Sequence, residues 1–155
     1  MAFSDEGQNV FSVDLTTRVG VHSALQHASN ACGLFTAVFA YGTFRILRIY
    51  DIATVPPLLL ILAAYIFCSA ALATWRLRIG KGAFAGAAML IALIVLPCVS
   101  LLIALAEEDG FSLFVAIPIA VGCFVVGRFV FIGLRAGRVL RSGAQFEDDI
   151  AEIFQ

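Results

Sequence analysis

The feature that most constrains this chain is a series of four apolar windows, at residues 28–47, 57–75, 83–106 and 111–133. A helix that crosses the hydrocarbon core of a bilayer needs about 20 such residues. The composition agrees, because hydrophobic residues make up 61% of the 155 positions and charged residues only 14%. Soluble domains have about 45–50% and about 25%. The sequence therefore predicts an all-α, polytopic integral membrane protein built on a four-helix transmembrane bundle.

Little of the chain lies outside the windows. We expect an N-terminal cytoplasmic and interfacial segment at 1–27, the bundle at 28–137 and a C-terminal cytoplasmic tail at 138–155. These segments are too short for a second globular domain. Residues 1–14 contain three acids and no Lys or Arg, which is unlike a cleavable secretory signal. The first span is therefore expected to act as an uncleaved targeting signal.

The basic residues predict the orientation. One membrane face has only two of them, Arg45 and Arg48. The face that holds both termini and the second connection has eight: Arg18, Arg76, Arg78, Lys81, Arg128, Arg135, Arg138 and Arg141. Because Lys and Arg are concentrated on the cytoplasmic side of membrane proteins, both termini are expected to be cytoplasmic. The expected location is a bacterial inner membrane.

Arg128 stands inside the fourth window. If this helix leaves the hydrocarbon near Gly133, Arg128 lies roughly 7 Å inside the boundary. Its guanidinium can then snorkel to headgroup phosphates while its methylenes stay in lipid. The alternative is that Arg128 turns into the bundle and contacts an anion or a partner's carboxylate, since no window contains an acid to pair with it.

Two pairs of glycines have the spacing used for close helix packing in membranes. Gly82 and Gly86 lie at the start of the third window, and Gly133 and Gly137 at the end of the fourth. Small residues four positions apart let helix backbones approach closely. Both pairs fall at the same membrane face of an antiparallel hairpin, so we expect them to pack on each other within the chain. A subunit interface is the alternative.

Two prolines interrupt the spans. Pro97 and Pro118 each remove a backbone hydrogen bond and are expected to kink their helices. Both lie roughly 10–12 Å from the outer boundary. Helix shaping accounts for them, because proline is frequent in spanning helices. Matched kinks would alternatively open a small outward-facing cavity lined by Cys98 and Ser100.

The sequence contains no recognisable catalytic or metal motif. It has no Gly-rich phosphate loop, no H-E-x-x-H and no G-x-S-x-G, so an enzymatic function is left uncertain and unsupported. His22 and His27 lie about 140° apart on a helix, so they do not predict a metal site or haem. The cysteines do not predict one either. The four cysteines fall one per window: Cys32, Cys68, Cys98 and Cys123. No cofactor is predicted, contacts with lipids are expected, and the basic residues at helix ends give no support for nucleic acid as a partner.

The two end segments are polar but carry apolar residues at helical spacing. Residues 9–30 include Val10, Val13, Val21 and Leu25 and are interpreted as an N-terminal interfacial helix. Near the C-terminus, four residues form the stripe of a short amphipathic helix: Phe146, Ile150, Ile153 and Phe154. Acids occupy its other face, which suits a protein partner better than an anionic leaflet. A frayed tail and an internal clasp on the basic stretch are the alternatives.

These features favour a small, non-catalytic integral membrane subunit that serves as a scaffold, assembly or accessory component of a larger membrane complex. Its partners would be other membrane subunits, further copies of itself, and lipids. The alternative is a self-associating pore or carrier for a small or anionic solute, using the kinked outer half and Arg128. The two hypotheses differ in whether the native particle contains unlike chains.

Overall fold

The computed structural model describes residues 15–49, 55–106 and 110–142, which form four α-helices. They are α1 (Arg18–Ile49), α2 (Pro57–Arg78), α3 (Ala83–Ala106) and α4 (Gly110–Arg141). The all-helical fold is confirmed, and α3 has the predicted bounds. α1 and α4 are longer than predicted, at 32 residues each, or about 48 Å. The predicted C-terminal helix lies outside the described residues.

Local sequence explains where the helices begin and end. Thr17 caps α1, because its Oγ1 accepts a hydrogen bond from the Gly20 N–H at 3.0 Å. α2 begins at Pro57, whose fixed φ and missing N–H suit a first turn. It ends in a glycine turn: Gly80 has a φ of 68°, and the Lys81 N–H reaches back to the carbonyl of Arg76 at 3.1 Å. This is the Schellman pattern, and it starts the tight connection to α3.

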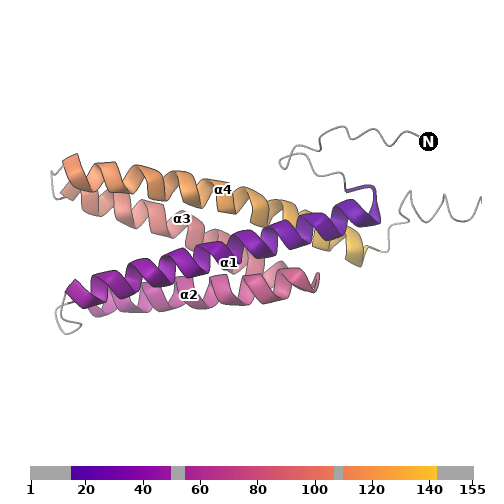
Figure 1. Cartoon of the computed structure of the whole chain (residues 1–155), viewed down its shortest axis with the longest axis horizontal. Helices are drawn as coiled ribbons and strands as arrows, with labels where there is room; N and C mark the ends of the chain where they lie inside the picture. Colours follow the sequence, from indigo (N-terminus) through magenta and orange to yellow (C-terminus); the bar gives the residue numbers. More distant parts are fainter. Residues whose placement is uncertain (1–14, 50–54, 107–109, 143–155) are drawn as a thin grey trace, which may run out of the picture.

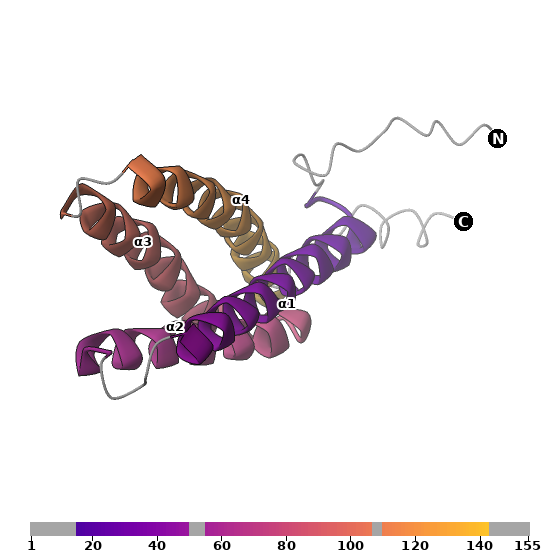
Figure 2. The ribbon, with the colours of Figure 1, turned by 60° about the vertical axis from the view of Figure 1, so that its left-hand side comes forward.

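The helices form an antiparallel ring in which each packs on the next and α4 returns to pack on α1. The ends of α1 and α4 that carry the chain termini extend together beyond the α2–α3 connection (Figure 1). At the opposite end the pair α1 and α2 diverges from the pair α3 and α4, which Figure 2 shows as an open V. The bundle is therefore closed at one end and splayed at the other. We call the closed end, which holds the start of α1, the α2–α3 connection and the end of α4, the basic end.

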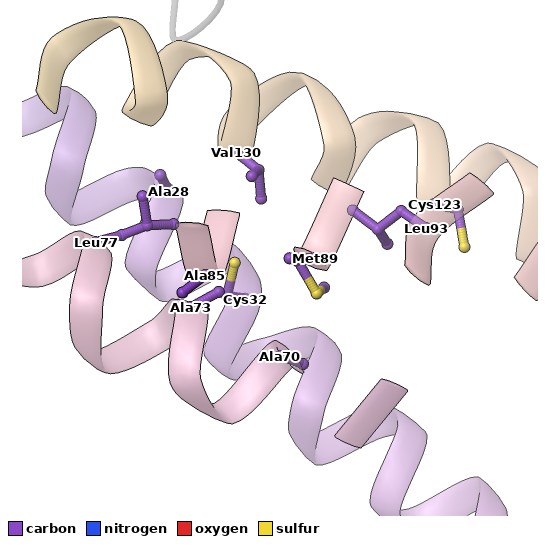
Figure 3. Close-up of a cluster of buried hydrophobic side chains, with 10 residues drawn as sticks. All are labelled: Ala28, Cys32, Ala70, Ala73, Leu77, Ala85, Met89, Leu93, Cys123 and Val130. Atoms are coloured by element: carbon purple, nitrogen blue, oxygen red, sulfur yellow. The ribbon is translucent and has the colours of Figure 1, made fainter. Parts of the chain in front are cut away.

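The main core lies toward the basic end and draws on all four helices (Figure 3). Many of its members are small: Ala28, Cys32, Ala70, Ala73 and Ala85. Small side chains let the backbones approach, which is how spanning helices gain van der Waals contact without a hydrophobic driving force. A polar link adds to this packing, since the Ser29 hydroxyl of α1 donates to the Thr74 carbonyl of α2 at 2.7 Å.

A second core cluster corrects the prediction for the N-terminal segment. Val21, Ala24 and Leu25 of α1 are buried against Ala136 of α4. Residues 18–27 are thus the first turns of α1 and do not form a separate interfacial helix, so that part of the prediction is wrong. The reason is that α4 continues to Arg141 and offers the apolar stripe of α1 a protein surface to cover it.

Three of the described helical segments are long and apolar enough to cross a membrane: Pro57–Arg78, Ala83–Leu105 and Phe114–Arg141. These segments support a membrane-embedded helical protein. They also expose large apolar side chains such as Phe84, Phe114 and Phe124, as lipid-facing helices do. α1 does not reach the same apolarity, because polar residues such as Ser29, Asn30 and Arg45 dilute it. A fourth span is therefore not established by apolarity.

Candidate functional site

A groove of about 530 Å³ lies between α3 and α4. The α3 wall consists of Leu90, Leu93, Ile94, Pro97 and Cys98. The α4 wall consists of Ala120, Cys123, Phe124, Gly127, Arg128 and Phe131. We call this hollow the α3–α4 groove. Both walls repeat at three- and four-residue intervals, so each is one face of a helix.

The groove forms where small residues of the α4 wall lie opposite leucine side chains of the α3 wall. A Cβ atom added at Gly127 would lie 3.9 Å from a Cδ atom of Leu90 and from one of Leu93, which is ordinary van der Waals contact, so the α4 backbone at Gly127 approaches the α3 wall without a side chain between them. Ala120 also contributes only a methyl group to the wall. The leucines of α3 and the small residues of α4 therefore line the groove along the helix pair.

The prolines have different positions relative to the groove. Pro97 lies within α3 and lines the groove, whereas Pro118 lies within α4, is exposed and does not line it. Of the two residues expected to line an outward-facing cavity, Cys98 lines the α3–α4 groove and Ser100 does not; the outward-facing cavity itself stays a prediction. The Ser100 hydroxyl instead donates to the carbonyl of Pro97 at 3.0 Å. Because proline has no N–H, the carbonyl of Leu93 loses its usual helical donor beside the groove.

Arg128 is exposed at the α4 wall, three residues inside the end of the groove marked by Phe131. Three features show that Gly133 lies at the level of Ala28, Thr74 and the exposed Trp75 within the bundle. Gly133 contacts Ala28, the neighbouring Ser29 bonds to Thr74, and Thr74 precedes an exposed Trp of the kind found at membrane interfaces. From that level to Arg128 is roughly 7 Å along the helix.

All Lys, Arg, Asp and Glu side chains among the described residues are of one sign, positive. The described residues contain all ten Lys and Arg of the chain and no Asp or Glu, since all eleven acids fall in 1–14, 50–54, 107–109 or 143–155. Seven more cations lie toward the basic end with Arg128: Arg18, Arg76, Arg78, Lys81, Arg135, Arg138 and Arg141. This end of the described bundle is suited to an anionic ligand or surface.

The four predicted glycines lie at close contacts, but the two pairs do not face each other as expected. A Cβ at Gly133 would come within 2.5 Å of the Ala28 Cβ on α1, and a Cβ at Gly86 within 2.6 Å of Leu134 Cδ2 on α4. Gly82 packs against Leu77, and Gly137 lies near the Gly80 carbonyl oxygen. These glycines therefore serve packing within the chain at the basic end, and the α1–α4 contact is the tightest.

The remaining candidate ligands do not form a metal site within the parts of the chain that the structure describes. No group of three or more His, Cys, Asp or Glu side chains gathers there. Cys32 and Cys123 are buried, while Cys68 and Cys98 are exposed, and all four are free thiols. His22 and His27 are both exposed on α1. The predicted docking stripe of Phe146, Ile150, Ile153 and Phe154 lies outside the described residues.

Sequence reasoning anticipated individual members of the groove, Pro97, Cys98 and Arg128, but not the groove itself. The available signal was the small residues 120 and 127 on the same face of the fourth window as Arg128. No known protein family, curated protein or solved structure matches this chain. The functional assignment therefore depends on the physical features of the molecule.

Proposed function

We propose that this chain is a small, non-catalytic subunit of a larger membrane protein complex, acting as a scaffold, assembly or accessory component. In this proposal it resides in a bacterial inner membrane with both termini cytoplasmic. α1 is the fourth span, and its polar residues are tolerated because it lies against α2 and α4. The turns of α1 before Ala28 extend into the cytoplasm with the end of α4.

The observation that carries this proposal is the splay of the two helix pairs (Figure 2). The buried members of the main core extend to Cys32, Ala70, Leu93 and Cys123, and beyond them Phe35, Leu96 and Ile119 pack against this core only partly buried. Beyond that level the pairs diverge, and large apolar side chains such as Val38, Ile61 and Leu102 are exposed. Spanning helices are stabilised by contact with other helices, so a helix from another subunit seated between the pairs would complete the packing.

Self-association into a pore or carrier for a small or anionic solute is the second candidate. The absence of acids among the described residues, together with Arg128 beside an open groove, favours it. Rings of basic side chains are a common means of admitting anions. In this case the open ends of several copies would face one another.

The test is gentle detergent extraction of the full chain from its native membrane, followed by mass measurement of the intact particle. Unlike chains present in fixed ratio support the subunit proposal. A particle whose mass is a whole multiple of this chain, with only lipid added, favours the pore or carrier. A monomer that retains activity in transport or assembly assays on its own would overturn both.

A further inference from the structure

We propose that the α3–α4 groove is a binding site for an anionic phospholipid, with one acyl chain lying along the groove and the phosphate held by Arg128. This inference goes beyond the proposed subunit function, because it assigns a specific ligand to a site within this chain alone. It rests on the length, shape and charge of the groove.

The length of the groove fits one leaflet. On α4 it runs from Phe131 to Ala120, which is about 16 Å at 1.5 Å per residue. The hydrocarbon core of a bilayer is about 30 Å thick, so one leaflet contributes about 15 Å. With the membrane boundary predicted near Gly133, the groove starts close to the headgroups and ends near the middle of the membrane. An acyl chain entering from the cytoplasmic leaflet would occupy its whole length.

The lining fits a hydrocarbon chain. Its side chains are almost all aliphatic or aromatic, and the polar groups among them are Arg128 and the thiols of Cys98 and Cys123. A free anion would find one guanidinium and no further side-chain donor except thiols, which are weak donors. Gly127 lines the groove without a side chain, opposite Leu90 and Leu93, whose Cδ atoms lie 3.9 Å from the position of an added Cβ. A chain of methylene groups is the ligand that gains most from such a surface.

The charge selects an anionic headgroup. Arg128 is exposed at the groove near its cytoplasmic end, and guanidinium binds phosphate oxygens through paired N–H donors. Arg135 and Arg138 follow on the same helix toward the cytoplasm, where they add attraction for negative lipids. The described residues contribute no acid to oppose this field. A lipid with a net negative headgroup is therefore preferred over a zwitterionic one.

The test uses purified full-length protein in detergent, supplied with equal amounts of phosphatidylglycerol and phosphatidylcholine and measured by native mass spectrometry. Wild-type protein is expected to retain one phosphatidylglycerol in preference to phosphatidylcholine. Arg128→Gln should lower that retention about tenfold, the change expected from losing a hydrogen-bonded charge. Arg135→Gln, a matched charge loss on the same helix outside the groove, should change it less than twofold.

A second pair of variants tests the acyl-chain path. Gly127→Leu places a side chain in the groove and should displace the lipid. Gly122→Leu is its control on the same helix, because a Cβ at Gly122 meets nothing within 4 Å. If Gly127→Leu does not fold, Ala120→Phe blocks the deep end of the same path. A circular-dichroism spectrum confirms that each variant used is helical.

Four results would overturn the proposal. They are equal retention of both lipids by wild type, equal effects of Arg128→Gln and Arg135→Gln, unchanged retention when the groove is filled, or displacement of the lipid by inorganic phosphate alone. The last result would identify a free-anion site. None of these outcomes depends on whether unlike subunits are found, so the lipid site and the subunit function can fail separately.

Discussion

Gly133→Ala should destabilise the bundle more than any other single methyl group added at a described glycine of α4. The new Cβ would lie 2.5 Å from the Ala28 Cβ on α1, well inside van der Waals contact. Neither atom can rotate away, because each is fixed to the backbone of its own helix. α1 and α4 must therefore move apart, and that movement disturbs the core contacts on either side.

The expected cost follows from comparison with another glycine of the same helix. Gly122→Ala meets nothing within 4 Å and should be neutral or stabilising by up to about 1 kcal/mol, because alanine favours helix. Overpacking a filled core costs about 1–3 kcal/mol. Gly133→Ala should thus be about 1–3 kcal/mol less stable than Gly122→Ala. Gly86→Ala should fall between them, since its nearest atoms belong to the movable Leu134 side chain.

Ala28→Gly provides the internal control. Without the Ala28 methyl, the nearest neighbours of a Cβ at 133 are Leu77 Cδ2 at 3.8 Å and the Ala24 carbonyl oxygen at 3.9 Å, which are ordinary contacts. The double variant should recover most of the loss, giving a coupling free energy of about 1–3 kcal/mol. The assay is reversible unfolding in mixed micelles, followed by circular dichroism as the fraction of denaturing detergent rises. Equal stability of Gly133→Ala and Gly122→Ala, or no coupling with Ala28→Gly, would refute the packing described here.

Three further predictions concern single features. Ser29→Ala removes the hydrogen bond to the Thr74 carbonyl and should lower the free energy of unfolding by about 0.5–1 kcal/mol. Ser100→Ala, which loses only a hydrogen bond within its own helix, should lower it less, and the reverse order in the same unfolding assay would contradict the interhelical role of Ser29. Arg128→Lys keeps the charge and the reach to phosphate, so expression and assembly should persist, whereas loss of the complex from a folded variant would indicate a partner carboxylate that needs the guanidinium. Deleting residues 146–155 should leave the bundle inserted and stable but release the partner subunit on co-purification, and retention of every partner would exclude docking through this segment.

The helices were predictable because membrane-spanning helices consist of long apolar runs, which are visible in the sequence. α3 matches its window because it is bounded by a glycine turn and by acids, both visible in the sequence. The start of α1 was not predictable in the same way. Val21 and Leu25 form the same stripe whether they face a membrane surface or a protein, and only the continuation of α4 past Gly133 decides between the two.

The candidate site was less predictable than the fold. Arg128 was conspicuous as a charge in an apolar run, but the groove depends on which face of α4 meets α3, a relation between helices that a local pattern does not contain. The glycine pairs illustrate the same limit. Their spacing indicated close packing, yet Gly133 contacts Ala28 on α1 and not the glycines of α3, because the ring closes through the α1–α4 contact.

The proposed topology is defined by the side of the membrane that each connection occupies. The measurement is a set of topology-reporter fusions at the N-terminus, Lys81, Glu108 and the C-terminus of the full chain. If α1 is the fourth span, the N-terminus, Lys81 and the C-terminus report from the cytoplasm and Glu108 alone reports from outside. If only the three most apolar segments cross, the N-terminus must report from the same side as Glu108, and the proposed cytoplasmic basic end formed by α1 and α4 would be contradicted.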